Sequence, residues 1–433
     1  MSRIAFFADM MGTLFDRRAP VAPAPSPEAV GRLCLALLSS QGEVSGVRIA
    51  RDILAHYRAM MAEERRAFFD FMAAQLDIQP DKVIEAATRY RDTRDAKAMA
   101  RLAREAEPRR QELLRRLNQA PGATEELVRM RLDLLRLLPQ APELGVIDLD
   151  FQHLFASWFN RGFLVLRPIG WGTPASILEK IIEDEAVHAI NDWEELRRRL
   201  LPADRRCFAF FHPAMPEEPL IFVEVALCEG VPGSVQSLLA EERPVLKESA
   251  FDTAVFYSIS NCQEGLRGIS FGNSLIKQVV EELRRDLPQV SRFVTLSPIP
   301  GLSRWLRDQN DAGAAELLEA AGARDVERLA PLATALRQHA ADYLIHAKRG
   351  DGQPADPVAR FHLGNGALVH DVHALADVSP NGLGQSCGAM VNYLYDLARV
   401  EPNNEAFVVN GTVATSKQIE ALLAQGARTG RRK

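Results

Sequence analysis

Apolar residues recur at helical spacing through the first part of the chain, from about Ser26 to Phe159, where signals for strands are nearly absent. Alanine, leucine, arginine and glutamate are frequent here, and all four are good helix formers. Proline and glycine stand at the breaks "DIQPD", "EPRR" and "APGA". Between these breaks the pattern predicts long helical runs, among them "RIARDILAHYRAMMAEERRAFFDFMAAQL" and "DKVIEAATRYRDTRDAKAMARLAREAE". Their charged faces are most simply interpreted as solvated surfaces, and a subunit interface is the alternative.

The pattern changes after "WFNRGFLVLRPIGWGTP", where strand-like runs begin to alternate with helices. The strand-like runs are "RCFAFFHP", "LIFVEVALC", "TAVFYSIS", "RFVTLSPIP" and "ARFHLGNGALVHDV", and the helices between them include "PASILEKIIEDEAV", "DWEELRRRLLP" and "NSLIKQVVEELRRDLP". This alternation predicts an α/β or α+β domain built on one sheet. The boundary is expected between Trp158 and Gly162, which gives a helical domain over residues 1–160 and a second domain over 161–433.

Composition and charge exclude several classes of protein. A chain of 433 residues with 47% hydrophobic and 25% charged residues is an ordinary globular protein, and its length favours two domains. The net charge is −5, and acidic and basic residues alternate along most of the chain, so the sequence shows no basic region typical of a nucleic-acid-binding protein. The N-terminal apolar run is too short and too interrupted for a signal peptide or a membrane span. Five scattered cysteines without C-x-x-C spacing speak against disulfides or structural zinc, so we expect a cytoplasmic protein.

A glycine-bearing loop joins a predicted strand to a predicted helix in "FYSISNCQEGLRGISFGNSLIKQVVEEL". A helix N-terminus offers unpaired N–H groups, and glycines let the backbone approach a diphosphate. The segment "RGISFG" approximates the R/Q-x-x-G-x-G/A loop with which GNAT acyltransferases hold the pyrophosphate of coenzyme A, although Ser270 replaces the middle glycine. An ordinary strand-to-helix turn is the competing interpretation. The dinucleotide and P-loop patterns are absent.

A serine ends the next predicted strand in "RFVTLSPIPG", because Pro298 and Pro300 block a central ladder beyond Ser297. Strand ends that border a phosphate-binding turn are where ligands lie in open sheets. The competing interpretation is a proline-rich turn whose serine bonds only its own backbone. His362, in "FHLGNG", has the same ambiguity, since a histidine beside a turn can be purely structural.

Three long stretches in colinear order resemble the malonyl-CoA decarboxylase family. They are "WFNRGFLVLRPIGWGTPASILEKIIEDEAVHAINDWEELRRRL", "FYSISNCQEGLRGISFGNSLIKQVVEELRRDLPQVSRFVTLSPIPGLSRWL" and "VARFHLGNGALVHDVHALADVSPNGLGQSCGAMVNYLYDL". They cover nearly the whole second half of the chain, and the helical first half fits the same family. The resemblance implies a helical N-terminal domain involved in oligomerisation, followed by a catalytic domain of GNAT type.

The resemblance also implies the site. Ser297 and His362 match the catalytic pair of the family, and Ser258, in "FYSIS", matches another polar position of its active site. The loop that would bind coenzyme A comprises Arg267, Gly268, Ile269, Ser270, Phe271, Gly272 and Asn273. Ser270 departs from the pattern, because animal members carry a glutamate there. Arg267 and Lys277 are candidate cationic partners of the phosphates, with a solvated side chain as the alternative for Lys277.

The resemblance therefore implies a lyase that converts malonyl-CoA to acetyl-CoA and CO2 through a thioester enolate. We expect no metal and no cofactor beyond the coenzyme A of the substrate, no nucleic-acid or membrane partner, and a homo-oligomer of tetramer size. The alternatives are a GNAT-type N- or O-acyltransferase and a non-catalytic acyl-CoA sensor. The combination of "LSPIPG" with "FHLGNG" favours the decarboxylase. The sequence leaves open which of Ser297 and His362 polarises the thioester carbonyl.

Overall fold

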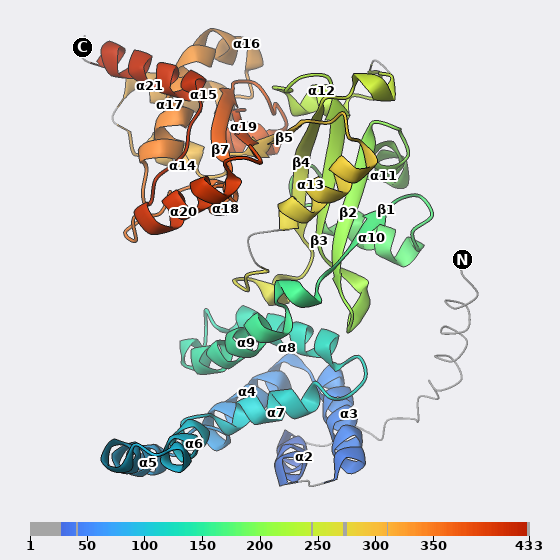
Figure 1. Cartoon of the computed structure of the whole chain (residues 1–433), viewed down its shortest axis with the longest axis vertical. Coiled ribbons are helices and arrows are strands. Elements are labelled where there is room, and N and C mark those ends of the chain that lie inside the picture. The colour runs from blue at the N-terminus through green and yellow to red at the C-terminus, as the bar shows by residue number, and fades with distance from the viewer. Residues whose placement is uncertain (1–26, 40–41, 244–245, 272–274, 310, 431–433) are drawn as a thin grey trace. The chain divides into compact units, whose positions relative to one another are not determined.

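The computed structural model describes residues 27–39, 42–243, 246–271, 275–309 and 311–430 (Figure 1). The chain separates into two compact units. One unit contains the described residues up to Asn160 together with Gln263–Ser270, and the other contains Arg161–Cys262 and the described residues from Phe271 onward. A helical unit is thus followed by an α/β unit, so the predicted fold class is confirmed. The excursion of Gln263–Ser270 into the helical unit had no signal in the sequence pattern.

Helices form the first unit throughout its described part. They are α2 (Pro27–Ser39), α3 (Glu43–Ala59), α4 (Ala62–Gln75), α5 (Pro80–Thr93), α6 (Ala96–Glu105), α7 (Arg109–Leu117), α8 (Ala123–Leu137) and α9 (Gly145–Trp158). Apolar side chains from most of these helices form the core, with Phe68, Phe69, Phe151 and Phe155 fully buried. None of the helices in the described part of the chain is long and apolar enough to cross a bilayer.

Both long helical runs predicted from the sequence are broken. The first run divides into α3 and α4 at Met60, whose backbone is extended, and the Met61 N–H donates to the carboxylate of Glu64, which starts the new helix. The second divides into α5 and α6, because Arg94 takes a left-handed conformation with φ 50° and Asp95 caps α6 by accepting from the Ala98 N–H at 2.7 Å. Polar side chains at the starts of α4 and α6 thus accompany two breaks that the apolar spacing alone did not show.

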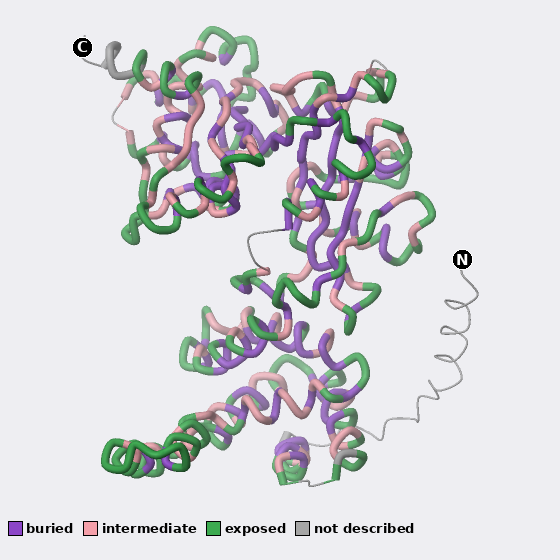
Figure 2. Tube along the Cα trace, in the orientation of Figure 1, coloured by how far each residue is buried: buried purple, intermediate pink, exposed green. Residues whose placement is uncertain are grey.

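Eight strands form one mixed sheet in the described part of the second unit. They are β1 (Val165–Ile169), β2 (Arg205–His212), β3 (Met215–Cys228), β4 (Thr253–Asn261), β5 (Arg292–Thr295), β6 (Ser297–Pro298), β7 (Leu368–His373) and β8 (Met390–Leu394). The order is β1-β2-β3-β4-β5-β8-β6, with β7 also paired to β8, and β4 and β5 are parallel. Figure 2 shows buried positions running along the central strands, so the sheet forms the core of this unit.

Helices cover the sheet and follow it. They are α10 (Ala175–Asp184), α11 (Trp193–Leu200), α12 (Val235–Leu239), α13 (Leu275–Asp286), α14 (Leu302–Arg307), α15 (Ala312–Gly322), α16 (Val326–Leu329), α17 (Ala333–His346), α18 (Pro357–Gly364), α19 (Pro380–Ser386), α20 (Val400–Asn410) and α21 (Lys417–Gly430). Apolar residues of α10 and α11 pack against Cys207, Ala209 and Phe211 of β2, which alternate along the strand and therefore share one face. Figure 1 shows α13 lying across strands β3 and β4.

A bulge in β4 divides its side chains between the two faces. Glu224 lies opposite Ser258 and Val225 opposite Phe256, so Tyr257 is an extra residue in β4. Directly paired residues point to the same face, whereas the successive residues Glu224 and Val225 point to opposite faces. Phe256 and Ser258 therefore face opposite sides of the sheet, although their spacing of two residues would place them together in a regular strand.

The run "ARFHLGNGALVHDV" was predicted as a strand, and this prediction is wrong in its first half. Residues 357–364 form helix α18, and only Leu368–His373 form a strand. The cause lies at the start of the helix, where Asp356 accepts hydrogen bonds from the Val358 and Ala359 N–H groups and Pro357 occupies the first helical position. His362 therefore lies on a helix instead of a strand.

Candidate active site

Ser297 lies at the first position of β6, directly after the parallel strand β5. It is paired with Val391 of β8, and Pro298 is paired with Met390, so both residues belong to the sheet. Only 6% of Ser297 is exposed. The turn that follows ends at Gly301, after which α14 begins. The prediction that the strand ends at Ser297 is therefore wrong by one residue, because Pro298 is itself paired with β8. The two prolines still leave little backbone freedom around the serine.

His362 meets this serine from the last turn of α18. Its Nε2 lies 3.2 Å from Ser297 Oγ, and its Nδ1 lies 2.8 Å from the hydroxyl of Tyr395. The ring of Tyr393 stacks on the imidazole at 4.6 Å between centroids and 24° between planes. Since His362 is 3% exposed, the pair lies in a nearly dry environment. The structure thus brings together the serine and the histidine that the sequence analysis selected.

The hydrogen bond that Ser297 donates to Thr295 favours one tautomer of His362. The Ser297 hydroxyl donates to Thr295 Oγ1 at 2.8 Å, and it has only one proton to donate. The contact between Ser297 and His362 is therefore a bond donated by Nε2–H. A neutral imidazole then has an unprotonated Nδ1, which accepts from the Tyr395 hydroxyl. Donation consequently runs in one direction, from Tyr395 through His362 and Ser297 to Thr295.

Asp356 forms hydrogen bonds with both segments that carry the Ser297 and His362 pair. Its carboxylate caps α18, which carries His362, and also accepts from the N–H of Gly301 at 3.4 Å. Gly301 follows Ser297 by four residues across a turn that contains two prolines. Because Asp356 is fully buried, its contacts to both segments are shielded from water. The position of Ser297 relative to His362 thus depends on one buried carboxylate.

Burial lowers the pKa of His362 from 6.5 to about 3. The imidazole is therefore neutral near pH 7 and serves as a hydrogen-bond donor through Nε2–H instead of as a positive charge. A side chain whose pKa is lower in the folded state binds fewer protons there than in the unfolded chain. Protonation of His362 consequently favours unfolding, and stability falls as the pH decreases from about 6.5 towards 3.

We expect this effect to appear in a comparison of the wild type with His362→Gln. The free energy of unfolding of the wild type should decrease, relative to that of the variant, by up to about 1.4 kcal/mol per pH unit below about pH 6. Urea titrations of both proteins at several pH values measure the difference. The other histidines titrate equally in both proteins and cancel. Parallel curves for the two proteins would show that His362 is not buried as a neutral side chain.

Ser258 has a different environment from Ser297. Its hydroxyl donates to the carboxylate of Glu185, with both oxygens within 2.9 Å, and lies 3.3 Å from Ser260 Oγ. The bulge at Tyr257 turns it to the face that α10 and α11 cover, whereas Thr295 shares the face of its partner Phe256. The structure does not bring Ser258 together with the Ser297 and His362 pair, and its predicted contact with substrate stays a prediction.

The glycine-rich loop continues from a short 3-10 turn at Glu264–Leu266. Arg267, Gly268 and Ser270 are exposed, Ile269 is buried and Phe271 is half-buried. Gly268 has φ +81°, a conformation that favours glycine. Upstream, the Gly265 carbonyl accepts from buried Arg131 of α8 at 2.8 Å, which anchors this end of the loop in the helical unit. Gly272 and Asn273, also predicted to bind coenzyme A, lie outside the described residues.

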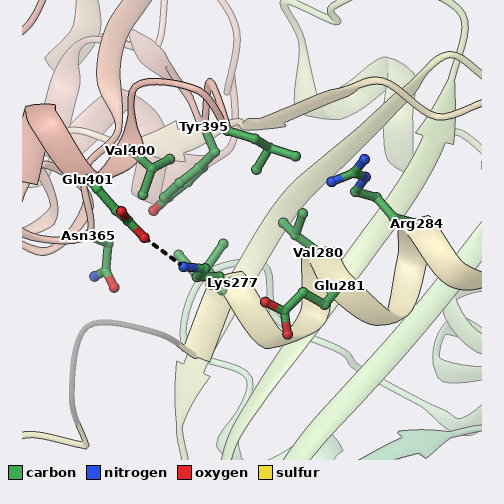
Figure 3. A pocket seen from close by; sticks show the side chains of 10 residues that line it. Lys277, Val280, Glu281, Arg284, Asn365, Tyr395, Val400 and Glu401 are labelled. Atoms are coloured by element: carbon green, nitrogen blue, oxygen red, sulfur yellow. Dashed lines mark hydrogen bonds and ion pairs between the residues drawn. The ribbon is translucent and has the colours of Figure 1, made fainter.

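A pocket of about 190 Å³ lies between α13 and the segment around α20 (Figure 3). Val280 and Val400 contribute apolar walls, and Tyr395, the hydrogen-bond partner of His362, also lines the pocket. Lys277 Nζ forms an ion pair with Glu401 at 3.2 Å across the pocket. The pocket therefore has apolar walls and exposed charged side chains. Through Tyr395 it also borders the hydrogen-bonded group that contains His362 and Ser297.

Sequence reasoning missed Thr295, Tyr395 and Asp356. Thr295 precedes Ser297 by two residues in "TLSP", so strand alternation could have placed both hydroxyls on one face. The pair Asp356-Pro357 is a standard helix-start signal that was overlooked beside the strand-like pattern. Tyr395 had no local signal, because its partner His362 is 33 residues away in the sequence.

Comparisons with known proteins agree along most of the chain. Residues 77–159 match the model of the malonyl-CoA decarboxylase N-terminal domain, and residues 162–433 match that of the C-terminal domain. The mitochondrial malonyl-CoA decarboxylase of Anser anser anser is 32% identical over 422 residues, which covers 87% of this chain and 84% of the relative.

Solved structures give the same result at higher identity. Malonyl-CoA decarboxylase from Rhodopseudomonas palustris is 50% identical with a TM-score of 0.85, covering 92% of this chain and 100% of that one. The enzyme from Agrobacterium vitis is 49% identical with a TM-score of 0.86, covering 91% and 99% of the two chains. With the family models, the curated relative and these structures in agreement, the chain belongs to the malonyl-CoA decarboxylase family.

Proposed function

We propose that this protein converts malonyl-CoA to acetyl-CoA and CO2, with Ser297 and His362 as catalytic residues. Family membership supports the reaction. The observation that supports the residues is the contact between Ser297 Oγ and His362 Nε2 at 3.2 Å, buried at the end of the parallel strand pair β4 and β5. A buried hydroxyl and a neutral imidazole can together supply the donors that the reaction needs.

Loss of CO2 from a malonyl thioester leaves its bonding electrons in an enolate, so negative charge develops on the thioester oxygen. The transition state is stabilised by donors already aimed at that oxygen in a water-excluded site. His362 suits this task because its Nε2–H points toward Ser297 and the ring is held between Tyr393 and Tyr395. We therefore assign His362 as the donor to the thioester oxygen.

Ser297 then lies next to the carbon that loses its carboxylate. The enolate carbon must gain one proton to become the methyl group of acetyl-CoA. The Ser297 hydroxyl is the donor nearest to His362, and turning it from Thr295 to the substrate would direct its proton at the malonyl group. The proton lost from Ser297 would be replaced along the chain from His362 and Tyr395, and finally from solvent.

The direct test uses purified protein and malonyl-CoA without an acceptor. The proposal predicts acetyl-CoA and CO2 in equal amounts. Chromatography of the thioesters measures the first product, and trapping of labelled CO2 measures the second. Absence of both products would overturn it. An acyl product on an added amine, without CO2, would instead identify a GNAT-type acyltransferase.

The pocket beside Tyr395 is proposed to receive part of the acyl-CoA. Its apolar walls suit the pantetheine arm, and Lys277 and Arg284 offer positive charge to the phosphates. Lys277 belongs to the first turn of α13, directly after the loop predicted to hold the pyrophosphate. Glu401 forms an ion pair with Lys277, so a phosphate would replace that carboxylate as its partner.

We expect Lys277→Met to raise KM for malonyl-CoA about fivefold with kcat nearly unchanged, because an exposed ion pair contributes up to about 1 kcal/mol. Methionine keeps the apolar stem of the side chain. Lys180→Met is the matched control, since Lys180 of α10 also pairs with a glutamate, Glu218, at 2.7 Å. Steady-state kinetics measure both variants. Equal KM values for wild type and Lys277→Met would remove Lys277 from the binding site.

Assembly and location belong to the same proposal. We propose a homotetramer formed in part through the helical unit, and a cytoplasmic location. All five cysteines are free thiols, as a reducing compartment allows.

We also propose that the reaction needs no metal and no cofactor beyond coenzyme A. Sedimentation of the full chain, and activity after extensive dialysis against a chelator, test these points.

A further inference from the structure

Thr295 carries a buried hydroxyl that contacts Ser297, and among the described residues it forms no hydrogen bond with His362. It ends β5 and is fully buried. Its Oγ1 accepts two hydrogen bonds, one from Ser297 Oγ at 2.8 Å and one from the backbone nitrogen of Tyr393 at 3.2 Å. One side chain thus connects the strand that leads to Ser297 with β8, which contains Tyr393, the tyrosine stacked on His362.

Its effect on the histidine follows from proton counting. While the Ser297 hydroxyl donates its hydrogen bond to Thr295, it can only accept a hydrogen bond from His362. The imidazole therefore keeps its proton on Nε2. Tyr395 does not impose this choice, because a phenol can either donate to or accept from Nδ1. Without the Thr295 acceptor, Ser297 could donate to Nε2, and the histidine proton would move to Nδ1 and point at Tyr395.

We propose that Thr295 is a positioning residue that selects the tautomer of His362 through Ser297. The inference rests on the proposed function, in which Nε2–H of His362 is the donor to the thioester oxygen. A histidine held in the other tautomer would present a lone pair to the developing negative charge and would repel it. The side chain of Thr295 thereby controls catalysis without touching the substrate.

The energetic scale of such an effect is large. Fixing the wrong tautomer of a catalytic histidine lowers kcat by about four orders of magnitude in a serine protease whose triad aspartate is replaced by asparagine. The effect here should be smaller, because a free Ser297 hydroxyl can still turn away from His362 for part of the time. We expect Thr295→Val to lower kcat by about ten- to a hundredfold, with KM within about twofold of the wild type.

The experiment compares three variants. Thr295→Val keeps the volume and removes the acceptor, whereas Thr295→Ser keeps the hydroxyl and should restore kcat to within about threefold. Thr253→Val is the matched control, because Thr253 of β4 is also fully buried and donates to Asp252 at 2.6 Å, away from the pair. It should leave kcat unchanged. Circular dichroism and thermal unfolding verify that each protein is folded.

A spectroscopic measurement reads the tautomer without turnover. In protein labelled with 15N-histidine, the signal that disappears in His362→Gln belongs to His362, and nitrogen shifts report which ring nitrogen carries the proton. We expect Nε2–H in the wild type and in Thr295→Ser, and Nδ1–H in Thr295→Val. Wild-type kcat in Thr295→Val, no rescue by serine, or an unmoved proton would overturn the inference. A wild type that produces no acetyl-CoA would instead overturn the proposed function.

Discussion

Replacing His362 or Ser297 by alanine is expected to lower kcat for malonyl-CoA decarboxylation by about two orders of magnitude or more, because a donor at a charge-developing oxygen contributes roughly 3 to 4 kcal/mol. The fold should survive both changes, since each side chain is a small part of a large core. Acetyl-CoA formation by purified, folded variants is the measurement. Near wild-type turnover in either variant would remove that residue from the mechanism.

Matched controls separate chemistry from packing. Ser303 of α14 is also buried and lies only six residues downstream of Ser297, and its hydroxyl contacts Cys387 Sγ at 3.7 Å. Ser303→Ala should therefore cost a similar amount of stability but leave kcat unchanged. For the histidine, His339→Ala removes an imidazole beside Trp305, away from the pair. A large loss of kcat in the controls would mean that general destabilisation explains the results.

Replacing Gly301 by alanine is expected to be the most damaging change in the turn after Ser297. A Cβ at this position would lie 1.9 Å from the hydroxyl of Tyr343 and 3.0 Å from Cζ of the same ring. Because Tyr343 is buried, the turn must move, which should cost about 2 to 3 kcal/mol of stability. The displacement would reach Ser297 through two prolines and lower kcat by about ten- to a hundredfold.

The double variant Gly301→Ala with Tyr343→Phe tests this cause directly. Removing the hydroxyl opens the closest contact, so the second change should recover part of both stability and kcat. Tyr343→Phe alone should cost no more than about 1 kcal/mol. Urea unfolding and kcat of all four proteins give the coupling energy, expected at about 1 to 2 kcal/mol. Additive effects would show that the contact with Tyr343 is not what requires glycine at this position.

Apolar periodicity predicted the helical first half and most of the strands of the second, but not β1, β8 or the helices that follow β6, apart from α18, which it mistook for a strand. The errors within the predicted elements share one physical cause. The breaks at Met60 and at Arg94–Asp95, and the helix that carries His362, all depend on side chains that bond the backbone at helix ends. Periodicity reports which face is buried, but not where a carboxylate caps a chain terminus. A search for Asp-Pro and similar starts would have found α18.

The bulge at Tyr257 is a second feature that periodicity cannot show. Ser258 follows the alternating pattern of a regular strand, which would place it on the face of Phe256 and so beside Thr295. One extra residue reverses its direction and places it against Glu185. Bulges depend on the register of the neighbouring strand, which a single strand sequence does not contain.

The linear chain was enough to identify the family and the helical and α/β halves, and to select Ser297 and His362 as candidates, because colinear motifs and local periodicity are properties of the sequence. The folded structure was needed to find the hydrogen-bonded chain of Tyr395, His362, Ser297 and Thr295, and the contacts of Asp356 to the segments that carry Ser297 and His362. These interactions join residues far apart in the chain, and their strength depends on distance and burial. Both quantities exist only after the strands and helices have packed.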